Sequence, residues 1–187
     1  MIPAVPQKIP TPDLEEGRAD PDLGSWSAED RIRWALNQYP KQTILTTSFG
    51  AQSSALLHLA TQIHPNLPVL FIDTGYHFPE TLSFAEDLKN RLRLHVRTYR
   101  PLLSPDEIES RYGRLWENGP EGLEQFHEII RVEPMRRAMR DMDPKIWIAG
   151  LRRCSSESRQ NMDFLTRQDA RLKLLPLLDW TDRDLGQ

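Results

Sequence analysis

The chain has 187 residues, of which 39% are hydrophobic and 27% are charged, and its formal net charge is −3. These values are typical of one globular domain, and they exclude an overall basic field that would favour nucleic acid. No stretch approaches the roughly 20 apolar residues of a membrane span, and the single cysteine excludes a disulfide framework or an all-cysteine metal site. We therefore expect a cytoplasmic protein with no metal, no nucleic acid and no membrane among its partners.

The chain begins with a proline-rich segment. Residues 1–25 contain five prolines and little apolar periodicity, so we predict a poorly ordered extension there. Residues 26–187 form the predicted domain. Its first helix begins after Ser27, a residue type that caps helices, and ends at Pro40.

The stretch 43–63 has the pattern of a strand, a tight turn and a helix. An apolar and β-branched run over Thr43–Thr47 leads into a turn that contains Ser48, Gly50 and Ser53, and a helical pattern follows. Such a turn directs free backbone N–H groups and a helix N-terminus to one place, which favours the binding of a phosphate group. An ordinary strand–helix connection capped by serine explains the same residues equally well.

The remaining chain alternates between predicted strands and helices. We predict strands at 69–72, 94–99, 145–149 and 172–175 and helices at 79–92, 121–130 and 133–142, whereas 101–122 has a weak pattern and 154–168 is loop-like. This alternation is typical of a parallel α/β sheet flanked by helices in a three-layer, Rossmann-like arrangement. Thr181 marks the start of one more helix, and the sequence ends in its first turns, so we expect a fragment, a truncated form or a product that has lost its tail.

Polar residues follow three of the predicted strands at their carboxyl ends, where ligands of open parallel sheets bind. Besides the serine-containing turn, these are Asp73 with Gly75, and a basic group made of Arg152, Arg153 and Arg159. Arginine side chains bind phosphate or sulfate through two hydrogen bonds, although a solvated basic loop has the same composition. Asp73 is either a ligand of a ribose hydroxyl or a cap for the next helix.

Cys154 and the five histidines are weaker candidates for chemistry. The arginines beside Cys154 favour a reactive thiolate, so it is a secondary candidate for a nucleophile, but an incidental loop thiol is the simpler interpretation. The histidines show no metal-ligand spacing, and we interpret all of them as structural or surface residues, His77 being the least certain.

Seven segments of the sequence carry a resemblance to a known family. They are residues 46–53, 73–81, 111–113, 115–116, 132–135, 150–153 and 175–180. In these segments, which follow one another in order, the chain resembles the phosphoadenylyl-sulfate (PAPS) reductase family, which has the adenine nucleotide alpha hydrolase-like fold with a modified pyrophosphate-binding loop.

The resemblance implies a binding site for the substrate at the carboxyl ends of the strands. It implies that the phosphosulfate is held by Ser48, Gly50, Gln52 and Ser53, that the nucleoside lies near Asp73 and Gly75, and that Arg152, Arg153 and Arg159 meet phosphate or sulfate. Nucleotide-hydrolysing relatives carry aspartate where this chain has Gln52. A neutral amide there avoids repulsion of an anionic phosphosulfate.

The resemblance also implies a reaction: thioredoxin-dependent reduction of 3′-phosphoadenylyl sulfate to sulfite and adenosine 3′,5′-bisphosphate in assimilatory sulfate reduction. Thioredoxin or glutaredoxin is the implied electron donor, and relatives often form homodimers. Reductases of adenylyl sulfate hold a [4Fe–4S] cluster on a cysteine pair, but Phe126 and His127 stand at those positions, so we expect no iron–sulfur cluster and no other bound cofactor.

The main departure from the family pattern concerns the nucleophile. In this family a cysteine in a C-terminal Glu-Cys-Gly-x-His-like tail attacks the sulfur, and the sequence contains no such tail. Three alternatives to a PAPS reductase therefore stay open at this point: a non-catalytic adenine-nucleotide-binding module, an adenylyl-sulfate reductase, and a tRNA sulfur-insertion enzyme of the same fold group.

Overall fold

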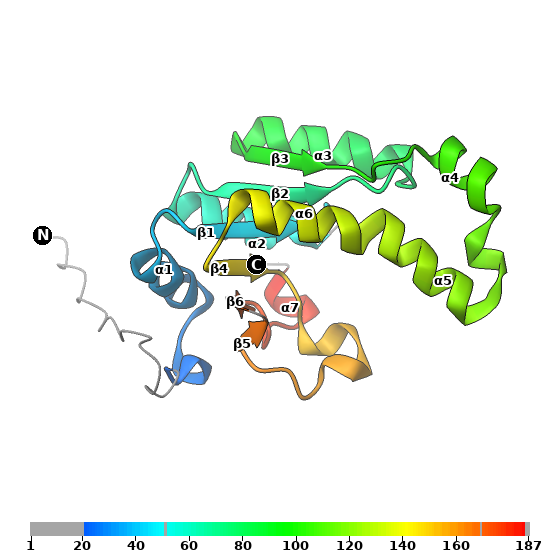
Figure 1. The fold of residues 1–187 in the computed structure, drawn as a ribbon. Coiled ribbons are helices and arrows are strands. Elements are labelled where there is room, and N and C mark those ends of the chain that lie inside the picture. Colours follow the sequence, from blue (N-terminus) through cyan, green and yellow to red (C-terminus); the bar gives the residue numbers. More distant parts are fainter. Residues whose placement is uncertain (1–20, 51, 169, 186–187) are drawn as a thin grey trace, which may run out of the picture.

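A six-stranded sheet forms the centre of the computed structural model, which describes residues 21–185 except 51 and 169 (Figure 1). The strand order is β3-β2-β1-β4-β6-β5. The strands are β1 (Thr43–Thr47), β2 (Pro68–Ile72), β3 (His95–Tyr99), β4 (Ile146–Ala149), β5 (Leu165–Gln168) and β6 (Arg171–Leu174). All neighbours pair in parallel except β5 and β6, which are antiparallel.

Helices cover the two faces of this sheet. They are α1 (Ala28–Gln38), α2 (Ser53–Ile63), α3 (Pro79–Leu92), α4 (Pro105–Tyr112), α5 (Gly119–His127), α6 (Glu133–Met142) and α7 (Asp182–Leu185). In Figure 1, α6 lies in front of β1 and β2 with α5 continuing its line, whereas α2 and α3 lie behind the sheet. The α1 helix packs on α2, and α2 packs on α3. The predicted three-layer α/β fold is thus confirmed.

Side chains of the central strands alternate between the two layers, as the period of a strand requires. Leu45 and Ile148 belong to the core that the sheet shares with α1, α2 and α3. Ile44 and Leu70 pack instead with Ala138 of α6. Because both faces are covered here, β2 is apolar over its whole length, and β1 is buried from Thr43 to Leu45.

Two segments differ from the prediction. The weak pattern at 101–122 contains α4, which Ser104 and Glu107 begin as a reciprocal capping box. The segment 154–168, predicted as a loop, ends in β5, an edge strand whose residues after Leu165 are half-buried or exposed. Polar composition hid this strand, because an edge strand needs no continuous apolar run.

The N-terminal prediction is corrected for residues 21–25. Leu23 begins a short 3-10 turn, is buried in the main core, and its carbonyl accepts a hydrogen bond of 2.8 Å from Arg31 Nε. Residues 1–20 lie outside the described residues. Within the described chain, we find no helix that is both long enough and apolar enough to cross a membrane.

Candidate functional site

The sheet has a topological switch point between β1 and β4. These strands are neighbours, but the chain continues from β1 to β2 on one side and from β4 to β5 and β6 on the other. Connections that leave in opposite directions open a crevice beyond the carboxyl ends of the two strands, where open α/β sheets bind ligands. The predicted turn at 48–53 follows β1, and the predicted basic group at 150–153 follows β4, so both lie at this switch point.

The turn after β1 is held by a buried aromatic side chain. Phe49 has a left-handed backbone (φ 50°) and packs edge-on against Phe71, with ring centroids 5.0 Å apart. Gly50, by contrast, has no positive φ. Burial of the Phe49 ring offsets the cost of the left-handed conformation and leaves Ser48 and Gly50 exposed at the crevice.

Ser53 closes the same turn. Its backbone N–H donates to the Gly50 carbonyl at 2.9 Å, and its hydroxyl donates to the same oxygen. The Ser53 hydroxyl hydrogen is therefore used within the protein, and its oxygen is left to accept a hydrogen bond from another donor. A role of Ser48, Gly50 or Ser53 in holding a phosphosulfate stays a prediction.

Arg152 joins the two sides of the switch point. Its side chain is 4% exposed and donates from Nη2 to Gln52 Oε1 and, at 2.8 Å, to Asp182 Oδ1. From Nη1 it donates to Cys154 Sγ at 3.2 Å and to the Trp180 carbonyl at 3.5 Å. The structure thus brings together Gln52 and Arg152, two predicted site residues that are 100 positions apart in the sequence.

The other two predicted arginines have different surroundings. Arg153 donates from Nη2 to the Met162 carbonyl at 2.8 Å and lies over the Phe164 ring, 5.1 Å from its centroid. Its side chain thereby holds the loop between β4 and β5 in place. Arg159 ends a 3-10 turn in that loop and is half-buried. As substrate ligands, Arg153 and Arg159 stay predictions.

Asp73 and Gly75 shape the turn after β2. Asp73 is buried and accepts from the Gly75 N–H at 3.2 Å and from Arg100 Nε at 2.8 Å. It caps no helix, because α3 begins after Phe78 without a side-chain cap. Gly75 has φ 79°, and a Cβ there would lie 2.8 Å from Pro105 Cγ. Glycine is therefore required for α4 to begin against this turn, and nucleoside contact by either residue stays a prediction.

Cys154 and His77 are both tied to backbone carbonyls. The exposed Cys154 thiol donates to the Trp180 carbonyl at 3.3 Å besides accepting from Arg152. His77 Nε2 lies 3.2 Å from the Ile72 carbonyl oxygen, and its ring lies 5.3 Å from that of Phe71. These contacts assign His77 a structural role. The nucleophilic role of Cys154 stays a prediction.

Sequence reasoning missed the partners that organise this region. Asp182 and the Trp180 carbonyl complete the surroundings of Arg152, and Arg100 pairs with Asp73. A capping pattern at Thr181 was the one available signal near Asp182. Thr181 donates through its N–H and its hydroxyl to Asp184 at 2.7 Å each, and these two bonds lower the pKa of Asp184.

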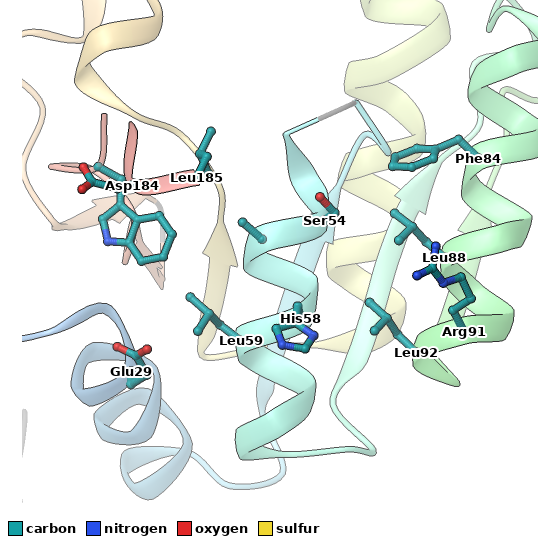
Figure 2. Close-up of a pocket in the computed structure, with 12 residues that line it drawn as sticks. Glu29, Ser54, His58, Leu59, Phe84, Leu88, Arg91, Leu92, Asp184 and Leu185 are labelled. Carbon is teal, nitrogen blue, oxygen red and sulfur yellow. The ribbon is translucent and has the colours of Figure 1, made fainter. Parts of the chain in front are cut away.

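An open groove of about 870 Å³ is lined by residues of α1, α2 and α3 and of the segment 180–185. Figure 2 shows Ser54 and His58 of α2 facing the side of the groove that carries Leu88 and Leu92 of α3, whereas Leu185 of α7 lies on the opposite side of α2. The lining contains none of the predicted site residues. The groove nevertheless borders the switch point, because Trp180 belongs to its lining and the Trp180 carbonyl accepts from Arg152.

Comparisons with known proteins agree with this geometry. Residues 42–187 match the model of the phosphoadenosine phosphosulfate reductase domain. A phosphoadenosine 5′-phosphosulfate reductase from Xylella fastidiosa (strain M12) is 45% identical over 187 residues, which cover all of this chain and 77% of that protein. A reductase of the same name from Thiocapsa roseopersicina is 47% identical over 158 residues, covering 84% of this chain and 66% of that protein.

Solved structures show the same fold. The crystal structure of PAPS reductase from Candida auris, a phosphate complex, superposes with a TM-score of 0.76 and 24% identity, covering 88% of this chain and 79% of that one. An NH3-dependent NAD synthetase from Campylobacter jejuni reaches a TM-score of 0.57 at 15% identity, covering 84% of this chain and 67% of that one. Taken together with the family match and the relatives above 40% identity, these findings show that the chain belongs to the phosphoadenosine phosphosulfate reductase domain family.

Proposed function

We propose that this protein is a PAPS reductase, which reduces 3′-phosphoadenylyl sulfate to sulfite and adenosine 3′,5′-bisphosphate in sulfate assimilation, and that the described domain binds the sulfonucleotide. The observation that carries the proposal is the hydrogen bond between Gln52 and Arg152 at the switch point. It joins the turn after β1 to the basic segment after β4, within a domain of this family.

The geometry of this region suits an anionic group. The exposed turn at Ser48 and Gly50 precedes α2, and free N–H groups at a helix N-terminus favour negative charge. Gln52 contributes a neutral amide beside the turn, so no carboxylate of its own repels the substrate. We propose that Ser48, Gly50, Gln52 and Ser53 hold the phosphosulfate while Asp73 and Gly75 lie near the nucleoside.

The 3′-phosphorylated substrate is favoured over adenylyl sulfate by the surroundings of Phe126. Reductases of adenylyl sulfate use a cysteine pair at the positions of Phe126 and His127 for an iron–sulfur cluster. Here Phe126 is buried, with its ring 5.0 Å from Tyr76 and 4.9 Å from Trp116. Aromatic packing fills the place of the first cysteine, which supports a reaction without a cluster.

The proposed reaction proceeds by thiol chemistry. A cysteine thiolate attacks the substrate sulfur, the S–O bond to the 5′-phosphate breaks, and adenosine 3′,5′-bisphosphate leaves with the electron pair. A thiolate of reduced thioredoxin or glutaredoxin then attacks the cysteine sulfur, sulfite leaves with the S–S electron pair, and the second donor thiol resolves the mixed disulfide. Because dithiol donors work in a reducing compartment, we propose a cytoplasmic location.

Cys154 is the secondary candidate for the attacking thiolate. Its sulfur already interacts with Arg152 and with the Trp180 carbonyl, which supports a structural role instead. We therefore propose that the described domain supplies substrate binding and leave the nucleophile unassigned.

Intact mass spectrometry combined with titration calorimetry tests the proposal. We expect the chain to bind PAPS and adenosine 3′,5′-bisphosphate and to gain no covalent sulfonate on Cys154. A sulfonate that disappears in Cys154→Ser would make Cys154 the nucleophile. Absence of binding to either nucleotide would overturn the proposed function, whereas Arg152→Met should weaken binding if the switch point is the site.

A further inference from the structure

The turn after β2 is shaped by hydrogen bonds within it. Asp73 Oδ1 accepts from the Gly75 N–H at 3.2 Å, and the Thr74 hydroxyl accepts from the Tyr76 N–H at 3.2 Å. This turn, residues 73–78, leaves the sheet at the carboxyl end of β2, on the side where Figure 1 shows α4. The second carboxylate oxygen of Asp73 is not used within the turn and is free to bind it to a neighbouring element.

Arg100 uses that second oxygen and so ties the turn to the next strand. Its Nε donates to Asp73 Oδ2 at 2.8 Å, and the Asp73 N–H donates to the Tyr99 carbonyl at 2.9 Å. The Asp73 side chain is 12% exposed, whereas that of Arg100 is 70% exposed. Because a buried carboxylate without a counterion is costly, the guanidinium of Arg100 stabilises Asp73 in its buried position.

The backbone of Arg100 is in turn held by α6. Arg137 Nη2 donates to the Arg100 carbonyl, and the Arg137 guanidinium is paired with Glu133 through two hydrogen bonds of 3.1 Å. An exposed ion pair usually contributes little, because ordering two long side chains costs entropy and solvent screens the charges. Here Asp73 is short and buried and the Arg100 backbone is bonded to α6, so their pair can define the position of the turn.

We propose that Arg100 is a positioning residue for the nucleotide, which acts through Asp73 and sets the turn 73–78 against the nucleoside. This inference rests on the proposed function, in which the nucleoside lies near Asp73 and Gly75. It adds a residue that neither the motifs nor the resemblance singled out. Because Arg100 acts through the carboxylate, the effects of changing Arg100 and Asp73 on nucleotide binding are coupled.

A double-mutant cycle tests this coupling. Arg100→Met, Asp73→Asn and the double variant are titrated with adenosine 3′,5′-bisphosphate by calorimetry, after circular dichroism has shown that each is folded. Asparagine keeps an oxygen that accepts from the Gly75 N–H but has no charge to pair with Arg100. We expect Arg100→Met to weaken binding by about tenfold in the wild-type background and by less than about twofold in the Asp73→Asn background.

Two further variants complete the design. Arg100→Lys keeps a cation within reach of Asp73, so it should recover part of the affinity that Arg100→Met loses, and it replaces that variant in the cycle if Arg100→Met does not fold. Arg97→Met is the matched control, because Arg97 is exposed in the same strand. It should bind the nucleotide as tightly as the wild type does.

Two results would overturn the positioning role. An unchanged affinity in Arg100→Met would make the pair with Asp73 an ordinary surface ion pair, and equal losses in both backgrounds would mean that Arg100 acts on the ligand without Asp73. In either case the wild type still binds the nucleotide, so the proposed function stands. A wild type that binds neither PAPS nor adenosine 3′,5′-bisphosphate would instead overturn the proposed function and the role of Arg100 with it.

Discussion

Arg152 and Lys173 are basic side chains of the same sheet region with opposite surroundings. Arg152, just after β4, is 4% exposed and has four partners, including the carboxylate of Asp182. Lys173, in the adjacent β6, is half-buried, and the one partner of its ammonium among the described residues is the ring of Trp147, whose centroid lies 4.6 Å from Nζ. A buried cation with complete partners holds elements together, whereas a half-buried one without a counterion stays partly solvated and adds little to stability.

Arg31 of α1 extends the comparison and should show the largest effect. Its side chain is 1% exposed and donates to both oxygens of Asp179, at 2.8 and 2.9 Å, and to the Pro176 carbonyl at 2.8 Å. Arg31→Met should lower the free energy of unfolding by about 3 kcal/mol, because it leaves the Asp179 carboxylate and the Pro176 carbonyl without their hydrogen-bond donor. Urea denaturation measures the loss.

Arg33→Met is the control for that variant, because Arg33 is exposed on the same helix. Its free energy of unfolding should stay within about 0.5 kcal/mol of the wild type. A loss below about 1 kcal/mol in Arg31→Met would contradict the view that complete partnering makes a buried arginine structural.

Arg152→Met should have the next largest effect. We expect a loss of about 2 kcal/mol in urea denaturation, because the hydrogen bonds to Gln52 and Asp182 disappear. The loss is smaller than for Arg31, since the Asp182 side chain is 82% exposed and regains water. Arg183→Met, at an exposed neighbouring position, should leave stability unchanged. If Arg152→Met is as stable as the wild type, Arg152 does not stabilise the fold and resembles Lys173 in this respect.

Lys173→Met should act in the opposite direction. Replacing an uncompensated, half-buried ammonium by an apolar side chain of similar length should raise the free energy of unfolding by up to about 1 kcal/mol in the absence of nucleotide. Thermal and urea unfolding without ligand measure this change. A clear destabilisation would reveal a structural partner for Lys173 and would remove the contrast with Arg152.

The smallest expected effect is a pH dependence of that difference. Because burial lowers the pKa of Lys173 on folding, the folded protein binds fewer protons than the unfolded chain between the lowered pKa and the ordinary value of about 10.4. The wild type therefore gains stability from this residue as pH rises through that window, and the advantage of Lys173→Met shrinks. Urea midpoints of both proteins from pH 8 upward test this prediction. A stability difference that does not change with pH would contradict a lowered pKa of Lys173 as its cause.

Patterns of local origin were predictable from the sequence. The bounds of β1, α3 and α6 agree with the prediction, because β-branched runs, an N-terminal proline and apolar periodicity act within a few residues. The Ser27 cap was equally visible, and its side chain accepts from the Asp30 N–H as expected. The placement of polar groups at strand ends followed from the parallel order of the sheet.

Features that depend on distant residues were not predictable in this way. Nothing near Arg152 in the sequence indicates Gln52, and nothing near Arg153 indicates that it turns to the Met162 carbonyl. From the sequence Lys173 is interpreted as an exposed position of a short strand, since only the register with Trp147 reveals its surroundings. The left-handed Phe49 was missed because burial in the folded chain, not residue type, holds it there.

The pair of Arg31 and Asp179 has a consequence for synthesis of the chain. The two residues are 148 positions apart, so at 5–20 residues per second the ribosome makes Asp179 on the order of ten seconds after Arg31. During that interval α1 lacks the carboxylate and the Pro176 carbonyl that its arginine needs. The parallel strands β1, β2 and β3 can already pair, so the first helix of the nascent chain is among the last to reach its final packing.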